Sequence, residues 1–205
     1  MNRALLKLLR LAVAAVALLG GCATSYVVDN SVQSFSGLAA LPAPATYRFE
    51  RLPLQQAPVQ AQLEAMADAA LHQAGLRRDD ANPRYSVQVA GGMQPIFSPW
   101  ADPWDRWGWG WGGWGVGLHH HRFGVGFGAP FRPESVWYHR EVSVVVRELA
   151  SATVVFESRA SNDGPWLDNT EVFPAMFQAA MQGFPTPPAG PRRVDIVVGT
   201  PKSTP

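Results

Sequence analysis

Residues 141–149 read EVSVVVREL, and residues 153–159 read TVVFESR after the short link 150–152. Valines recur at every second position from 142 to 146, so an extended backbone places them on one face. The second run is similarly rich in β-branched and aromatic residues. Because a link of three residues joins antiparallel neighbours, the two runs predict a β-hairpin with one apolar face.

Five further segments show the period of a strand or a helix. Apolar residues alternate with polar ones in the strand candidates and recur at steps of three and four in the helix candidates. The predicted strands are 47–50, 85–90 and 193–198, and the predicted helices are 58–75 and 171–182. This order predicts an α+β fold with two layers, a mostly antiparallel sheet and two helices. A long insertion separates the second strand from the hairpin.

Proline and glycine indicate where the helices begin and end. Pro58 is tolerated at a first helical position, and Gly75 can take the left-handed conformation that ends a helix. Pro174 is harmless only in a first turn, so the second helix is expected to start after Glu171.

The segments that flank the predicted domain are rich in turn and coil formers. Asp29, Asn30 and Ser31 favour turns, and further serines and prolines follow them, so residues 22–45 are expected to be a tether. The domain itself is expected over residues 46–199. Residues 200–205 are expected to be a disordered tail.

The insertion, residues 91–135, is dense in tryptophan and glycine. Six tryptophans fall within fifteen positions: Trp100, Trp104, Trp107, Trp109, Trp111 and Trp114. Indole combines a large apolar face with a polar N–H, which suits contact with a partner protein, a lipid headgroup or a glycan. The alternative is a loop that folds back over an exposed face of the sheet, with the indoles serving as core.

A histidine tract, residues 119–121, follows the tryptophans. Strand alternation would point His119 and His121 the same way, and Asp102 or Asp105 could complete a metal site. No recognised zinc spacing is present, so a solvated basic loop tip is the alternative.

No motif in the chain points to catalysis. There is no G-x-S-x-G sequence, and the glycines of 124–128 lack the spacing of a dinucleotide loop. We therefore expect no enzyme activity and no cofactor, since a site needs convergent groups. A hydrolase with paired carboxylates stays open, because such pairing depends on folding and not on sequence distance.

The N-terminus has the layout of an export signal. Basic residues precede the apolar run 11–19, and Gly20 and Gly21 then precede Cys22, the single cysteine. The run has nine residues, whereas a transmembrane anchor needs about 20, so cleavage after residue 21 is the better interpretation.

The segment around Cys22 resembles the lipobox of bacterial lipoproteins. In those proteins the thiol receives a diacylglycerol, the chain is cut before it, and the new amine is acylated. Ala23 follows the cysteine, where these lipoproteins usually carry aspartate if they stay in the inner membrane. The resemblance therefore implies an outer-membrane protein, lipid-anchored on the periplasmic face.

Charge and cysteine content narrow the choice of partners. Without residues 1–21 the chain has 14 basic and 16 acidic residues, a formal net charge near −2. A nucleic-acid binder would show a basic excess, so nucleic acid is not an expected partner. With Cys22 acylated no disulfide can form, and the fold must rest on its apolar core.

Several motifs together resemble bacterial lipoproteins that carry domain of unknown function number 4136. They are the lipobox, Tyr47-Arg48-Phe49, residues 71–76 (LHQAGL), Tyr85-Ser86-Val87, the aromatic–glycine insertion and the valine-rich hairpin. The family usually has an aspartate and a tryptophan where Glu148 and Phe156 stand here. The resemblance implies a fold and a location. It implies no mechanism and no site residues.

Overall fold

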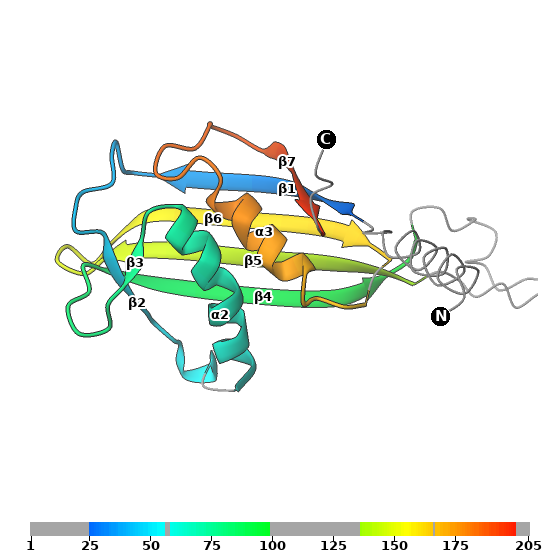
Figure 1. The fold of residues 1–205 in the computed structure, drawn as a ribbon, viewed down its shortest axis with the longest axis horizontal. Helices are drawn as coiled ribbons and strands as arrows, with labels where there is room; N and C mark the ends of the chain where they lie inside the picture. The colour runs from blue at the N-terminus through cyan, green and yellow to red at the C-terminus, as the bar shows by residue number, and fades with distance from the viewer. Residues whose placement is uncertain (1–24, 56–57, 99–135, 166, 200–205) are drawn as a thin grey trace, which may run out of the picture.

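The computed structural model describes residues 25–55, 58–98, 136–165 and 167–199. Within them, seven strands form one sheet in the order β3-β2-β4-β5-β6-β1-β7, and α2 and α3 lie on one of its faces (Figure 1). The strands are β1 (Tyr26–Ser36), β2 (Thr46–Phe49), β3 (Arg77–Arg78), β4 (Tyr85–Ile96), β5 (Trp137–Glu148), β6 (Thr153–Gly164) and β7 (Arg192–Val198). The helices are η1 (Pro53–Gln55), α2 (Pro58–Gln73) and α3 (Val172–Met181). The predicted α+β fold is confirmed.

The hairpin of β5 and β6 occupies the middle of the sheet, as the valine pattern predicts. Val142, Val144 and Val146 are completely buried beneath the helices. The two strands pair antiparallel, with a register shift between Val146 and Arg147. Both strands are longer than predicted and reach Trp137 and Gly164.

The two helices begin and end where the proline and glycine signals predict. α2 starts at Pro58, and Gly75 has a φ of 96° just beyond its end. α3 starts at Val172, which places Pro174 in the first turn, where its missing N–H costs no helical hydrogen bond. α2 connects β2 to β4, and these strands pair parallel. Leu63 and Leu71 of α2, together with Phe177 of α3, pack into the core.

The expectation of a tether is wrong for residues 26–36, which form β1. This strand pairs antiparallel with β6 on one side and β7 on the other. Val28, Asn30 and Val32 point into the core. The apolar–polar alternation of this strand is hard to recognise in the sequence because Asn30, a turn former, occupies one of the inward positions. The domain therefore starts at β1 and not at residue 46.

The insertion also begins later than predicted. Gly91 and Gly92 continue β4, which runs on to Ile96 and stays paired with β5. A Cβ atom on Gly91 would lie 2.9 Å from Leu63 Cδ2 of α2 and 3.5 Å from Phe173 Cε2 of α3. Glycine at this position leaves room for the side chains of the two helices to pack close against the strand. The segment beyond Ser98, up to residue 135, lies outside the described residues.

The face of the sheet away from the helices is polar. Gln88, Ser143 and Arg159 lie on it, half-buried or exposed. The hypothesis of a loop folded back over this face concerns residues beyond the described ranges, so it stays a prediction.

Replacing Val32 tests the position of β1 in the core. Val32→Ala should lower the free energy of unfolding by about 1–3 kcal/mol, because it removes fully buried apolar surface. The neighbouring exposed change Gln33→Ala should stay within about 0.5 kcal/mol of wild type. Urea unfolding of the three proteins measures both effects. Equal, small changes would contradict a core position for β1.

Candidate functional site

The end of the sheet from which the insertion emerges is the first candidate site. β4 ends there at Ile96, opposite Trp137, the first residue of β5. β1 begins at the same end with Tyr26, opposite Val198 of β7. Figure 1 shows these strand ends together on one side of the domain. We call this end of the sheet the insertion end.

The strand registers show how close these ends lie. One transverse row of the sheet consists of Ser31, Ser161, Glu141 and Gly92. Counting five residues from this row toward the insertion end leads to Tyr26 in β1, to Phe97 just beyond β4 and to Val136 just before β5. The start of β1 and both ends of the insertion are therefore level with one another.

Exposed apolar side chains gather at the insertion end. Of the nine large hydrophobic residues that are exposed in the described ranges, six lie there, and we call them the apolar rim. They are Val27 (49% exposed), Met93 (36%), Phe97 (67%), Val136 (48%), Leu167 (65%) and Val197 (65%). Val27 and Val197 are direct cross-strand neighbours. Single exposed apolar residues are ordinary, so the concentration of six at one end is what makes this end a candidate interaction surface.

A buried polar row supports the rim from beneath. Arg140, Asn162 and Asn30 are neighbours across β5, β6 and β1, and each is at least 97% buried. Arg140 Nε donates a 2.7 Å hydrogen bond to Asn169 Oδ1, and Asn169 Nδ2 lies 3.4 Å from Met93 Sδ. Burial lowers the pKa of the Arg140 guanidinium. The row fixes the loop that carries Leu167 to the sheet.

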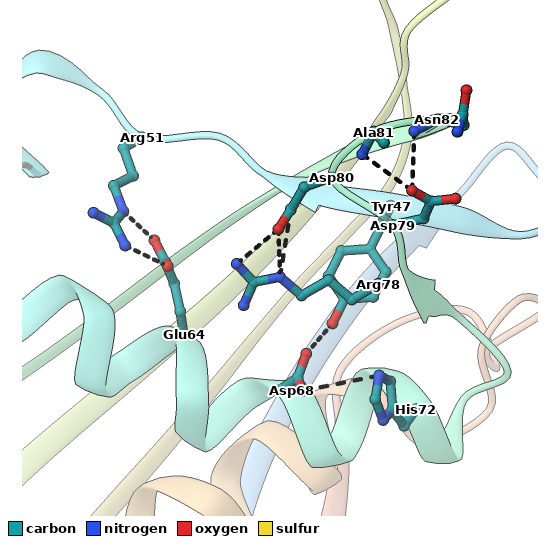
Figure 2. Close-up of polar contacts among 10 residues, drawn as sticks. All are labelled: Tyr47, Arg51, Glu64, Asp68, His72, Arg78, Asp79, Asp80, Ala81 and Asn82. Atoms are coloured by element: carbon teal, nitrogen blue, oxygen red, sulfur yellow. Dashed lines mark hydrogen bonds and ion pairs between the residues drawn. The ribbon is translucent and has the colours of Figure 1, made fainter.

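A second polar cluster lies between α2 and β2 (Figure 2). The Tyr47 hydroxyl donates a short hydrogen bond to Asp68 Oδ1, and His72 Nε2 lies 3.8 Å from Asp68 Oδ2. Tyr47 is completely buried, whereas His72 is exposed. Burial and then the hydrogen bond to Asp68 raise the pKa of Tyr47, so the hydroxyl keeps its proton at neutral pH.

Two ion pairs extend this cluster along the same edge. Arg51 donates to both Glu64 carboxylate oxygens, at 2.6 and 2.7 Å, and this bond raises the pKa of the Arg51 guanidinium. Arg78 Nε lies 3.2 Å from Asp80 Oδ2. Bidentate pairing is the strong form of such contacts. The cluster therefore fastens α2 to the edge of the sheet, and its carboxylates are occupied by protein donors.

A shallow groove of about 410 Å³ lies between α2, α3 and β7. Met66, Gln73 and Gln178 line it from the helices, and Ile196 from the strand. Among its lining residues Glu171 is the only titratable side chain. The groove therefore offers apolar and amide contacts but no pair of groups for acid–base chemistry.

Most of the sequence-predicted site residues lie outside the described ranges. These are Cys22, the six tryptophans from Trp100 to Trp114, His119 and His121, and Asp102 and Asp105. Their predicted roles in lipidation, partner binding and metal binding stay predictions. Within the described ranges no three histidine, cysteine or acidic side chains group as a metal site. No helix there is long and apolar enough to cross a membrane.

Sequence reasoning missed the buried polar row and the apolar rim. Arg140 follows a histidine and precedes a glutamate, so its neighbours in sequence give no sign of burial. The rim residues come from β1, β4, β7 and the two loops around β5 and β6, and only the strand pairing brings them together. The sequence holds one signal for part of this arrangement: Val28 and Val32 flank Asn30 at inward positions and indicate a strand there.

Comparison with known proteins gives one family match. The model of a domain of unknown function, DUF4136, matches residues 31–186. No curated protein matches the chain.

Three solved structures resemble the fold distantly. The PelC dodecamer from Paraburkholderia phytofirmans is 13% identical, with a TM-score of 0.46, covering 78% of this chain and 99% of that one. A PelC variant with methionine in place of a leucine, from the same organism, is also 13% identical, with a TM-score of 0.44, covering 74% of this chain and 94% of that one. A PDZ domain protein from Parabacteroides distasonis gives 14% identity, a TM-score of 0.43, and coverage of 90% of this chain and 42% of that one. At these values the likenesses carry no argument about function.

The Tyr47–Asp68 hydrogen bond predicts a loss of stability at high pH. The pKa of Tyr47 is raised in the folded protein, so above pH about 10 the unfolded chain releases a proton that the folded chain keeps. The free energy of unfolding should therefore fall as pH rises above that value. Tyr47→Phe should cost about 1–3 kcal/mol at neutral pH and flatten the alkaline fall. Urea unfolding at several pH values measures both, and an unchanged alkaline slope would contradict the assignment.

Proposed function

We propose that this chain, which belongs to the DUF4136 family of domains of unknown function, is a non-enzymatic lipoprotein of the bacterial outer membrane. It is anchored through acylated Cys22 on the periplasmic face and binds a partner of the cell envelope through the tryptophan–glycine insertion. The partner is a protein, a lipid or a glycan.

The anchor is supported by the sequence around Cys22 and by the place where the chain enters the domain. Cys22 lies four residues before Tyr26, the first residue of β1. A chain spans at most about 3.6 Å per residue, so the lipidated cysteine lies within about 14 Å of the sheet. Several acyl chains hold a protein firmly at a membrane, whereas one chain gives marginal binding.

The binding role is supported by the position of the insertion, and this observation carries the proposal. The insertion starts and ends on a rigid antiparallel pair, β4 and β5, whose last paired residues are Ile96 and Trp137. A loop fixed at both ends to a stable scaffold is a common position for recognition residues. Its six tryptophans supply the large, amphipathic contact area that dominates many interfaces.

Binding is favoured over catalysis by the structural contacts that the described polar side chains make. Asp68 accepts from Tyr47, Glu64 is held by Arg51, and Arg140 donates to Asn169. These contacts join one structural element to another. Each cluster has a complete structural role in packing a helix or a loop against the sheet.

Removing the thiol tests the anchor. Cys22→Ser should abolish incorporation of radiolabelled palmitate and release the protein from the membrane fraction, since no other cysteine can accept the lipid. Cell fractionation and labelling measure both. Ser25→Ala, three residues beyond Cys22, is the matched control and should leave both unchanged. Labelling of the Cys22→Ser chain would overturn the anchor.

Photo-crosslinking in cells tests the binding surface. A photoreactive residue at Trp109 should give a discrete adduct, and one at Gln73, exposed on α2, should give none. Mass spectrometry of the adduct then identifies the partner. A lack of adducts at both positions would count against the insertion as a docking surface.

A further inference from the structure

We infer that the apolar rim is a membrane-contact surface, which rests the insertion end of the sheet on the lipids of the same membrane leaflet that holds the anchor, the periplasmic leaflet. This inference rests on the proposed lipid anchor and names lipid as the occupant of the rim. Its residues are those defined above, all in the described ranges.

The first argument is the length of chain between the anchor and the domain. Tyr26 is level with Phe97 and Val136 in the sheet, and four residues separate it from Cys22. At about 3.6 Å per residue, this link cannot carry the anchor to the opposite end of a strand of 11 residues. The end that carries the rim is therefore the end held at the bilayer.

The second argument is the distribution of exposed apolar side chains. Six of the nine in the described ranges lie at this end, and the other three, Phe35, Leu52 and Val59, lie elsewhere. Phe97 and Leu167 each leave about two thirds of their surface exposed. Side chains of this kind gain free energy when they enter the headgroup and acyl boundary of a bilayer.

The aromatic residues of this end are of the type that membrane interfaces favour. Tyr26, Trp137 and Tyr138 are half-buried at the insertion end. Tyrosine and tryptophan are enriched where an apolar body meets lipid and a polar tip meets water. Tyr26 adjoins Val27 in the chain and Trp137 adjoins Val136, so these aromatic residues accompany the apolar rim.

The charges predict how the contact is made. Among the described residues, the exposed acids Asp163 and Asp168 flank the rim, and Asp163 Oδ1 lies 2.6 Å from His139 Nδ1. Hydrogen bonds from Thr170 lower the pKa of Asp168, which keeps it ionised at neutral pH. The contact is therefore hydrophobic, and it should not require anionic lipid or low salt.

Site-specific labelling of the full lipidated protein tests this inference. Cys22 is acylated, so a cysteine introduced by Leu167→Cys is the one free thiol for an environment-sensitive fluorophore. Phe35→Cys is the matched control, because Phe35 is 60% exposed and Leu167 65%. Phe35 lies near the opposite end of β1, paired with Glu157. Both proteins are reconstituted into phosphatidylcholine vesicles that contain a spin-labelled phosphatidylcholine.

The expected result is a blue-shifted emission at position 167 that the spin-labelled lipid quenches, at low and at high salt alike. Emission at position 35 should stay that of a water-exposed probe and respond to iodide. If position 167 responds like position 35 while the protein floats with the vesicles, the rim does not contact lipid, although the anchor and the partner proposal survive. If the protein does not float, the anchor itself fails and this inference fails with it.

Discussion

Two helices cover the middle of one face of a seven-stranded sheet, and the arrangement of the domain depends on that burial. α2 and α3 pack against each other and against the valines of β4 and β5, and Gly91 allows them to approach the strand closely. The hydrogen bond from Tyr47 to Asp68 and the Arg51–Glu64 pair then fix α2 laterally. Apolar burial thus holds the two helices on the sheet, and the polar contacts at its edge fix the position of α2.

The polar clusters that hold the helices in place are distinct from the apolar side chains that the domain exposes. The clusters with the appearance of a catalytic site, such as Tyr47 with Asp68 and His72, lie beside α2 and join elements together. The apolar rim lies at the ends of the strands, where β4 ends at Ile96 and β5 begins at Trp137. A scaffold fastened at its edge leaves one end available for contacts, and this suits a binding role better than a catalytic one.

Periodicity predicted the parts of the fold that follow a simple pattern. The valines of β5 alternate, and the apolar residues of α2 and α3 recur at helical spacing, so these elements could be placed although α2 also buries Gln60 and Glu64. β1 could not, because Asn30 occupies an inward position, where its side-chain Nδ2 donates to the carbonyl oxygens of Val28 and, across the sheet, of Val194. Gly91 looks like a break in the strand pattern, because its reason is a tertiary contact with α2 and α3 that the local sequence does not reveal. The apolar rim is an outcome of strand pairing, so no local signal could reveal it.

β1 has a consequence for the order in which the chain can fold. It is the first strand in the sequence, yet its partners are β6 and β7, and Tyr26 pairs with Val198 near the other end of the chain. Contacts of such sequence separation form late, because closing long loops has an entropic cost before the contacts can compensate for it. β1 therefore cannot join the sheet until β6 is available, and its second edge stays unpaired until β7 has formed.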